Sequence, residues 1–122
     1  MMNPHSPTGT FRPLTSTDDT EAAIAESWSH PVLIFKHSFS CGTSAEAYEE
    51  LETLGDAPII YLVDVQMSRA VSRSVADRFD IRHESPQALL VWHGQVRWAA
   101  SHYHVTADEV RQALSTLACD EA

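Results

Sequence analysis

Three short, nearly unbroken apolar runs occur in this chain, at residues 31–35, 59–65 and 87–92. Runs of this length without alternation are typical of strands covered on both faces. Segments 44–54 and 68–79 lie between them and place apolar residues at four-residue steps, which predicts helices. Because a helix joins the first two strands, we expect them to be parallel, with a right-handed crossover.

A further apolar segment, 95–99, follows the third strand after the turn 93–94 alone. So short a link predicts an antiparallel hairpin. Helices are also expected over 18–28, where carboxylates open the segment, and after the capping box 106–109. The expected fold is therefore α/β, with a four-stranded mixed sheet and helices on both faces. This is the thioredoxin architecture.

The length of 122 residues and the apolar fraction of 43% fit one domain that needs no disulfide staples. Residues 1–13, rich in proline and polar side chains, are predicted to be a flexible leader, and 14–122 the single domain. A net charge of −9 argues against nucleic acid as a partner, and no stretch is apolar enough to span a membrane. The absence of a signal-like N-terminus predicts a cytoplasmic protein with reduced thiols.

Cys41 is the first residue of a Cys-Gly-Thr-Ser sequence between a predicted strand and a predicted helix. Free N–H groups and the positive end of the helix dipole stabilise a thiolate there, so its pKa is expected below about 8.5. The alternative is a buried cysteine that packs as a small apolar residue. Ser44 replaces the second thiol of a Cys-x-x-Cys turn. It is expected to donate a hydrogen bond to the Cys41 sulfur, to cap the helix, or both.

Ser85-Pro86 precedes the third strand. A strand-start proline is an ordinary feature, but in the predicted topology this proline is expected to be cis and to lie against Cys41. The backbone of Ser85 could then pair with an incoming chain. The same topology places residues 102–104 near Cys41 and Cys119 at the opposite pole, so no disulfide between the two cysteines is expected.

Two motifs resemble the YtxJ family of monothiol bacilliredoxins, over roughly residues 30–112. They are Lys36-His37-Ser38-x-x-Cys41-x-x-Ser44 with Ala45 and Tyr48-Glu49, and Arg82-His83-Glu84-Ser85-Pro86-Gln87-Ala88 with Trp98-x-Ala100-Ser101-His102.

The resemblance implies a thioredoxin-like redox protein that uses the small thiol bacillithiol as co-substrate, with no bound cofactor. Cys41 would take bacillithiol from a mixed disulfide and free the client protein. A second bacillithiol, another redoxin or a reductase would then regenerate the thiol. The family's serine and its cis-proline correspond to Ser44 and Pro86. Gly42 stands where the family usually has proline, which is expected to loosen the turn and alter the redox potential.

His37 and His83 are expected to border the thiol, where each either adjusts its protonation or makes structural hydrogen bonds. Arg82 is the expected contact for the carboxylates of bacillithiol, and Gly42, Thr43, Ser85 and Pro86 complete the predicted substrate site. Arg69, Arg73 and Arg78 are interpreted as a solvated helix face. Paired metal-ligand spacings are lacking, so no metal site is predicted.

Two other functions remain open at this point. The chain could be a sensing or binding module that is modified reversibly at Cys41 and passes the signal by contact. A peroxide-reducing thiol would need an arginine and a hydroxyl to activate peroxide, and no such motif precedes Cys41.

Overall fold

The computed structural model describes residues 11–55 and 57–121. Its strands are β1 (Phe11–Pro13), β2 (Val32–His37), β3 (Ile59–Asp64), β4 (Gln87–Trp92) and β5 (Gln95–Ser101). Its helices are α1 (Thr17–Glu26), α2 (Gly42–Glu52), α3 (Arg69–Phe79) and α4 (Ala107–Glu121), with a 3-10 turn, η1 (His102–His104), before α4.

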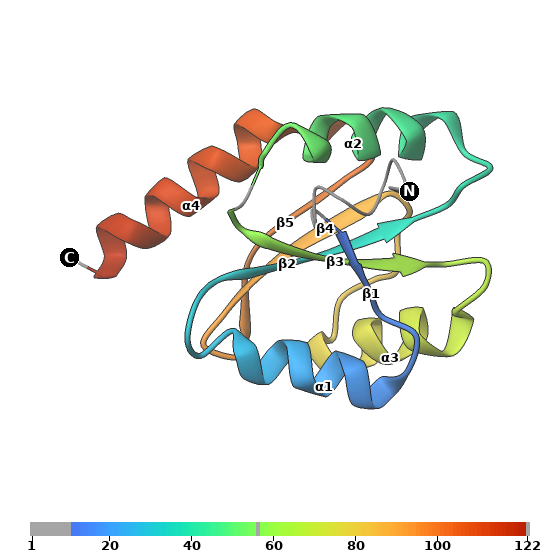
Figure 1. Cartoon of the computed structure of the whole chain (residues 1–122), viewed down its shortest axis with the longest axis horizontal. Coiled ribbons are helices and arrows are strands. Elements are labelled where there is room, and N and C mark those ends of the chain that lie inside the picture. Colours follow the sequence, from blue (N-terminus) through green and yellow to red (C-terminus); the bar gives the residue numbers. More distant parts are fainter. Residues whose placement is uncertain (1–10, 56, 122) are drawn as a thin grey trace, which may run out of the picture.

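The strands form one mixed sheet in the order β1-β3-β2-β4-β5. β1, β2 and β3 are parallel, whereas β4 runs antiparallel to β2 and forms a hairpin with β5. Figure 1 shows α1 and α3 on one face of the sheet and α2 and α4 on the other. The predicted α/β fold, with a parallel crossover, a hairpin and helices on both faces, is confirmed.

The strand count differs from the prediction, because residues 11–13 add a fifth strand beside β3. Phe11 packs against Tyr48, with ring centroids 4.6 Å apart, and Leu14 is buried. A three-residue edge strand that ends in proline is too short for periodicity to reveal. These three residues therefore belong to the sheet. The rest of the predicted leader, residues 1–10, lies outside the described part of the chain.

The side chains of β2 alternate between two buried clusters. Leu33 and Phe35 pack with α2 and α4, while Val32 and Ile34 pack with α1 and α3. Every residue of β2 is buried, including its last two, Lys36 and His37. The strand is longer than the apolar run that predicts it, and it carries two titratable groups into the interior.

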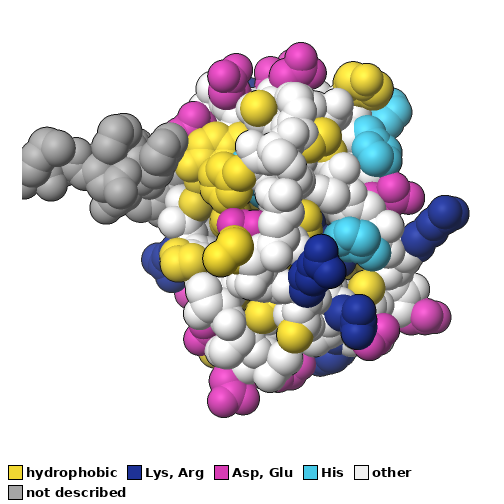
Figure 2. Space-filling model, turned by 90° about the vertical axis from the view of Figure 1, so that its right-hand side faces the viewer, with side chains coloured by type: hydrophobic (Ala, Val, Ile, Leu, Met, Phe, Trp, Pro, Cys, Tyr) yellow, Lys and Arg dark blue, Asp and Glu magenta, His cyan; other side chains and the backbone are white. Residues whose placement is uncertain are grey.

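Four connecting segments emerge at one end of the sheet, which we call the Cys41 end. In the strand register, His37 lies beside Asp64, Lys36 beside Gln87, and Gln87 beside Ser101. The loops after β2 and β3, the segment before β4 and the turn η1 therefore meet there. Figure 2 shows this face, toward which β2 and β3 point in Figure 1.

Helix α4 leads away from the Cys41 end (Figure 1). Cys119 lies exposed near its far end, and neither cysteine forms a disulfide. No helix in the described residues has the length and apolar content needed to cross a bilayer.

Candidate active site

Cys41 is the N-cap residue of α2, in extended backbone conformation, and it is partly exposed. Its N–H donates to the Ser38 carbonyl oxygen at 3.2 Å, and its own carbonyl oxygen accepts from the N–H of Ala45 at 3.0 Å. These bonds fix the turn between β2 and the helix. The thiol is therefore held at the N-terminus of α2, where it is partly accessible to solvent.

The surroundings of this sulfur favour its anion. The backbone N–H of Ser44, followed by that of Thr43, lowers the pKa of the Cys41 thiol below its ordinary value. Partial burial opposes this effect, and the hydroxyls of the same two residues add to it. The neutral thiol does not cap the helix. A helix N-terminus with free amides thus serves to hold a thiolate, which is the nucleophilic form of cysteine.

Ser44 joins the loop to the helix and is fully buried. Its Oγ accepts a hydrogen bond from the N–H of Ser38 at 3.3 Å, and the same hydroxyl helps lower the pKa of Cys41. The sequence left open whether this hydroxyl serves the sulfur, caps the helix, or does both. It acts on the sulfur, and its backbone partner is the N–H of Ser38 in the preceding loop rather than an amide of α2.

We expect Ser44→Ala to raise the pKa of Cys41 only in part, because the backbone amides remain. The variant should also lose about 1 kcal/mol of unfolding free energy, since the Ser38 N–H loses its acceptor. Ultraviolet thiolate absorbance against pH, in a Cys119→Ser background, measures the first effect, and urea denaturation measures the second. Ser40→Ala is the matched control and should leave the thiol pKa unchanged. An unaltered pKa in Ser44→Ala would contradict this role.

Gly42 is the first residue of α2, and its surroundings do not require glycine. A Cβ placed there would meet no heavy atom within 4 Å. Cys41 has φ −110° and ψ 126°, the extended conformation that a following proline imposes.

Gly42→Pro should therefore be tolerated and raise the unfolding free energy by about 0.5–1 kcal/mol, because proline suits the first helical position and restricts the unfolded chain. Urea denaturation measures this gain. Gly94→Ala is the contrasting control, because φ at Gly94 is +76° and a Cβ there would lie 3.2 Å from the Trp28 Nε1. A destabilised Gly42→Pro variant would show that the turn needs glycine.

The Ser85–Pro86 peptide bond is cis, as the topology predicted. Pro86 is buried, and its carbonyl oxygen accepts from the N–H of His102 at 2.9 Å. The His102 ring lies 2.9 Å from the carboxylate of Glu84. Ser85 Oγ is buried and has no hydrogen-bond partner among the described residues. The segment before β4 is thus tied to η1, and it carries one buried polar side-chain atom without a partner in the described part of the chain.

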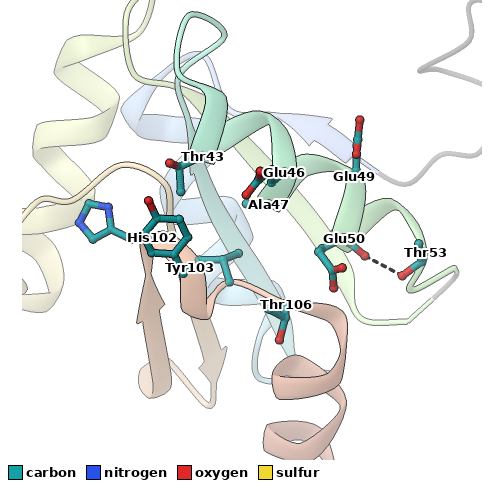
Figure 3. A pocket seen from close by; sticks show the side chains of 10 residues that line it. Thr43, Glu46, Ala47, Glu49, Glu50, Thr53, His102, Tyr103 and Thr106 are labelled. Atoms are coloured by element: carbon teal, nitrogen blue, oxygen red, sulfur yellow. Dashed lines mark hydrogen bonds between the residues drawn. The ribbon is translucent and has the colours of Figure 1, made fainter.

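A cavity of about 450 Å³ opens between α2 and η1, beside Thr43. His102 and Tyr103 line it from η1, and Thr43 and Glu46 line it from α2 (Figure 3). Since Thr43 belongs to the turn that Cys41 begins, this cavity adjoins that turn. The predicted proximity of residues 102–104 to the Cys41 turn therefore holds for His102 and Tyr103.

His37 lies beneath the first turn of α2 and is almost completely buried. Its ring contacts Phe35, Phe39 and Tyr48, with centroids 4.2–5.4 Å apart. Burial lowers the pKa of His37, while Asp64 and the backbone of Ser44 oppose this shift. The lowered pKa favours the neutral imidazole at pH 7. The ring interacts with the backbone of Ser44, and Ser44 in turn acts on the Cys41 thiol.

His83 lies apart from His37, on the α3 side of the sheet. Its Nδ1 is 3.2 Å from the Lys36 Nζ and 3.2 Å from the Ser72 Oγ. Lys36 is fully buried, and burial lowers its pKa to about 8. No role for Lys36 or Ser72 was predicted from the sequence. The sequence feature that could have indicated a buried lysine is the position of Lys36, directly after an apolar run typical of a strand covered on both faces.

Arg82 does not line the cavities that flank the Cys41 turn. Its side chain is 90% exposed and lies 4.0 Å from the carboxylate of Glu84. Among the described residues, no group of three or more His, Cys, Asp or Glu side chains could hold a metal ion. The structure thus gathers Cys41, Thr43, Ser44 and the Ser85–Pro86 segment at one end, with Arg82 outside them.

Comparisons with known proteins agree with this geometry. The family profile described as "Monothiol bacilliredoxin BrxC" matches residues 12–110. A solved structure, whose description proposes an oxidoreductase with a thioredoxin fold, is 31% identical with a TM-score of 0.80; the match covers 86% of this chain and 94% of that one. Thioredoxin from Fasciola hepatica is 17% identical with a TM-score of 0.69, covering 86% and 97% of the two chains. Thioredoxin from Trypanosoma brucei brucei is 11% identical with a TM-score of 0.71, covering 95% and 97%.

A thiolate site at a helix N-terminus in this fold defines the class as a thiol oxidoreductase with a thioredoxin fold. Within that class, the match over most of the sequence decides the family. The chain belongs to the monothiol bacilliredoxin family.

Proposed function

We propose that this protein removes bacillithiol from mixed disulfides on client proteins, using Cys41 as its nucleophile. The observation that supports this most is the single thiol at the N-cap of α2, partly exposed and with a lowered pKa. Ser44 occupies the position of a resolving cysteine, and Cys119 lies on α4, which leads away from the Cys41 end. Such a site exchanges one disulfide at a time and leaves the small thiol on itself.

In the first step the Cys41 thiolate attacks the bacillithiol sulfur of the mixed disulfide. The bond between client and bacillithiol breaks, a bond between Cys41 and bacillithiol forms, and the client leaves as a thiolate that takes up a proton. In the second step another bacillithiol thiolate, or a thiolate of a different redoxin, attacks the sulfur held on Cys41. Cys41 leaves as a thiolate, and the attacking thiol becomes the new disulfide partner. The number of disulfides is unchanged in each step.

The residues around Cys41 supply binding rather than chemistry in this proposal. The backbone of Ser85, next to the cis-proline, can pair with the extended chain of a client. The cavity lined by Thr43, His102 and Tyr103 gives room for an adjoining side chain. We propose the cytoplasm as the location, where a reduced thiol is the resting state.

The test uses a client protein that carries bacillithiol on one cysteine. On mixing with the reduced protein, we expect intact mass spectrometry to show the client losing the mass of bacillithiol and this chain gaining it, on Cys41. Added bacillithiol should then restore the free chain, so that a small amount of protein clears an excess of client. Modification of Cys41 that no added thiol or redoxin reverses, or no transfer at all, would overturn the proposal. Stable modification without turnover would favour the sensing module.

A further inference from the structure

A second cavity, of about 430 Å³, lies on the α3 side of the Cys41 end. We call it the α3 cavity. It is lined by Gln66 from the loop after β3, by Arg69, Ser72 and Arg73 from one face of α3, and by His83. Figure 2 shows basic side chains gathered beside a histidine on this face of the molecule. In a chain with a net charge of −9, such a concentration of cationic groups is unusual.

The two arginines of this cavity are available to a ligand. Within the described part of the chain, the side chains of Arg69 and Arg73 form neither an ion pair nor a hydrogen bond. Arg78, on the same helix, lies 3.4 Å from the carboxylate of Glu21. Both lining arginines are exposed and four residues apart, so they project from the same side of α3. Two unpaired guanidinium forks on one side are suited to carboxylates, which arginine binds through two parallel hydrogen bonds.

Beneath them lies a buried positive charge. Lys36 is fully buried, and its Nζ contacts the Nδ1 of His83, which faces the cavity. No carboxylate lies within ion-pair distance of Lys36 among the described residues; the nearest acidic neighbour of His83, Glu84, is directed to His102. A buried ammonium without an anionic partner is costly, and an anion bound in the cavity would offset that cost.

The α3 cavity shares a wall with the Cys41 turn. Gln66, which lines the cavity, donates a hydrogen bond from its Nε2 to the Oγ of Ser40 at 3.0 Å. Ser40 is bonded to Cys41 in the chain. The N–H of Val65, also in the lining, donates to the carbonyl oxygen of His37 at 3.0 Å. The α3 cavity therefore adjoins the loop that carries the Cys41 thiol.

We infer that the α3 cavity binds the carboxylate groups of the small thiol exchanged at Cys41, through the guanidinium groups of Arg69 and Arg73 with Lys36 beneath. The inference rests on the proposed function for the identity of that ligand as a carboxylate-bearing thiol. It replaces Arg82, which lies outside the cavity, as the carboxylate contact. The site selects between small thiols by charge, while the chemistry at the sulfur stays the same.

The first test measures binding without any thiol chemistry. Succinate, as a dicarboxylate probe, is titrated into Cys41→Ser protein while the imidazole resonances of His83 are followed by NMR. We expect a saturable shift at His83, and at least a tenfold loss of succinate affinity in Arg69→Gln/Arg73→Gln. Arg78→Gln is the matched control and should bind as before. Arg73→Lys keeps the positive charge but loses the planar guanidinium group that donates two parallel hydrogen bonds to a carboxylate, so it should also weaken binding.

Two results of that titration would overturn the inference. One is the absence of a saturable His83 shift with succinate. A saturable shift with inorganic phosphate but not with succinate would count as this result, because the site would then bind anions other than carboxylates. The other is equal affinity in Arg69→Gln/Arg73→Gln and Arg78→Gln.

The second test measures selectivity in the reaction itself. The rate of Cys41 with a small disulfide that bears carboxylates is divided by its rate with a neutral one. We expect Arg69→Gln/Arg73→Gln to lower this ratio about tenfold with little change in the neutral rate, and Arg78→Gln to leave it unchanged. An unchanged ratio in the double variant would overturn the inference even if client release proceeds. Succinate binding without client release would instead contradict the proposed function alone.

Discussion

Replacing Cys41 with serine is expected to slow transfer of the small thiol from a client by about 1,000-fold or more, because the nucleophile is lost. A serine hydroxyl at the same helix mouth stays protonated at neutral pH, so the amides of Thr43 and Ser44 have no anion to stabilise. Folding should be little affected, since the thiol is partly exposed and does not cap α2.

The measurement is the rate of client release, followed by intact mass, for the wild type and Cys41→Ser at the same concentration. Cys119→Ser is the matched control: it removes the other thiol, which lies exposed on α4, and should react at the wild-type rate. Full activity in Cys41→Ser, or a large loss in Cys119→Ser, would show that the working thiol has been misassigned.

Lys36→Met is expected to stabilise the protein. The wild type holds an ammonium in a fully buried position, and burial lowers the pKa of Lys36 from 10.5 to about 8. Methionine has a similar length and needs no solvation. His83 keeps the hydroxyl of Ser72 as a partner in the variant. At pH 7 we expect a gain of about 2 kcal/mol in unfolding free energy, after allowance for screening by nearby water.

The pH dependence gives this prediction its distinctive form. Between pH 8 and 10.5 the unfolded chain binds a proton at Lys36 that the folded chain does not, so the stability of the wild type rises with pH in this window. Below pH 8 both states are protonated and the penalty is constant. The stability difference between Lys36→Met and the wild type should therefore be largest at pH 7 and shrink as pH approaches 10.5.

Urea denaturation of both proteins from pH 7 to 10 tests this difference. Lys36 is the only lysine of the chain, so its titration can also be followed directly by NMR of lysine-labelled protein. Arg78→Met, which removes an exposed charge from α3, is the control and should show no such pH-dependent difference. A Lys36→Met variant less stable than the wild type at pH 7 would mean that an anion already offsets the buried charge.

The expected gain also bears on the α3 cavity. A charge that destabilises the fold is commonly retained at sites that bind ligands. If the cavity binds carboxylates, Lys36→Met should become more stable while losing succinate affinity. The same variant thus separates a structural lysine from one that serves a ligand.

The course of the chain is largely readable from its sequence. Three apolar runs become β2, β3 and β4. The helical segment between the first two predicts a parallel crossover, and the short link from β4 to β5 predicts a hairpin. The position of Cys41 between strand and helix predicts the lowered pKa, since that effect arises from amides within three residues of it. The edge strand β1 escapes detection because its three residues gain their stability from Phe11 packing on Tyr48.

The features that follow from the amino-acid order alone are therefore local: the order of the elements, the turn that begins α2 and the nucleophile it presents. Which distant side chains lie together depends on the folded chain, because strand register and helix packing set those distances. Register extends β2 so that Lys36 is buried beneath His83, 47 residues further along the chain. Arg69 and Arg73, which were interpreted as part of a solvated helix face, line a cavity in the packed structure. Arg82 lies in solvent outside it.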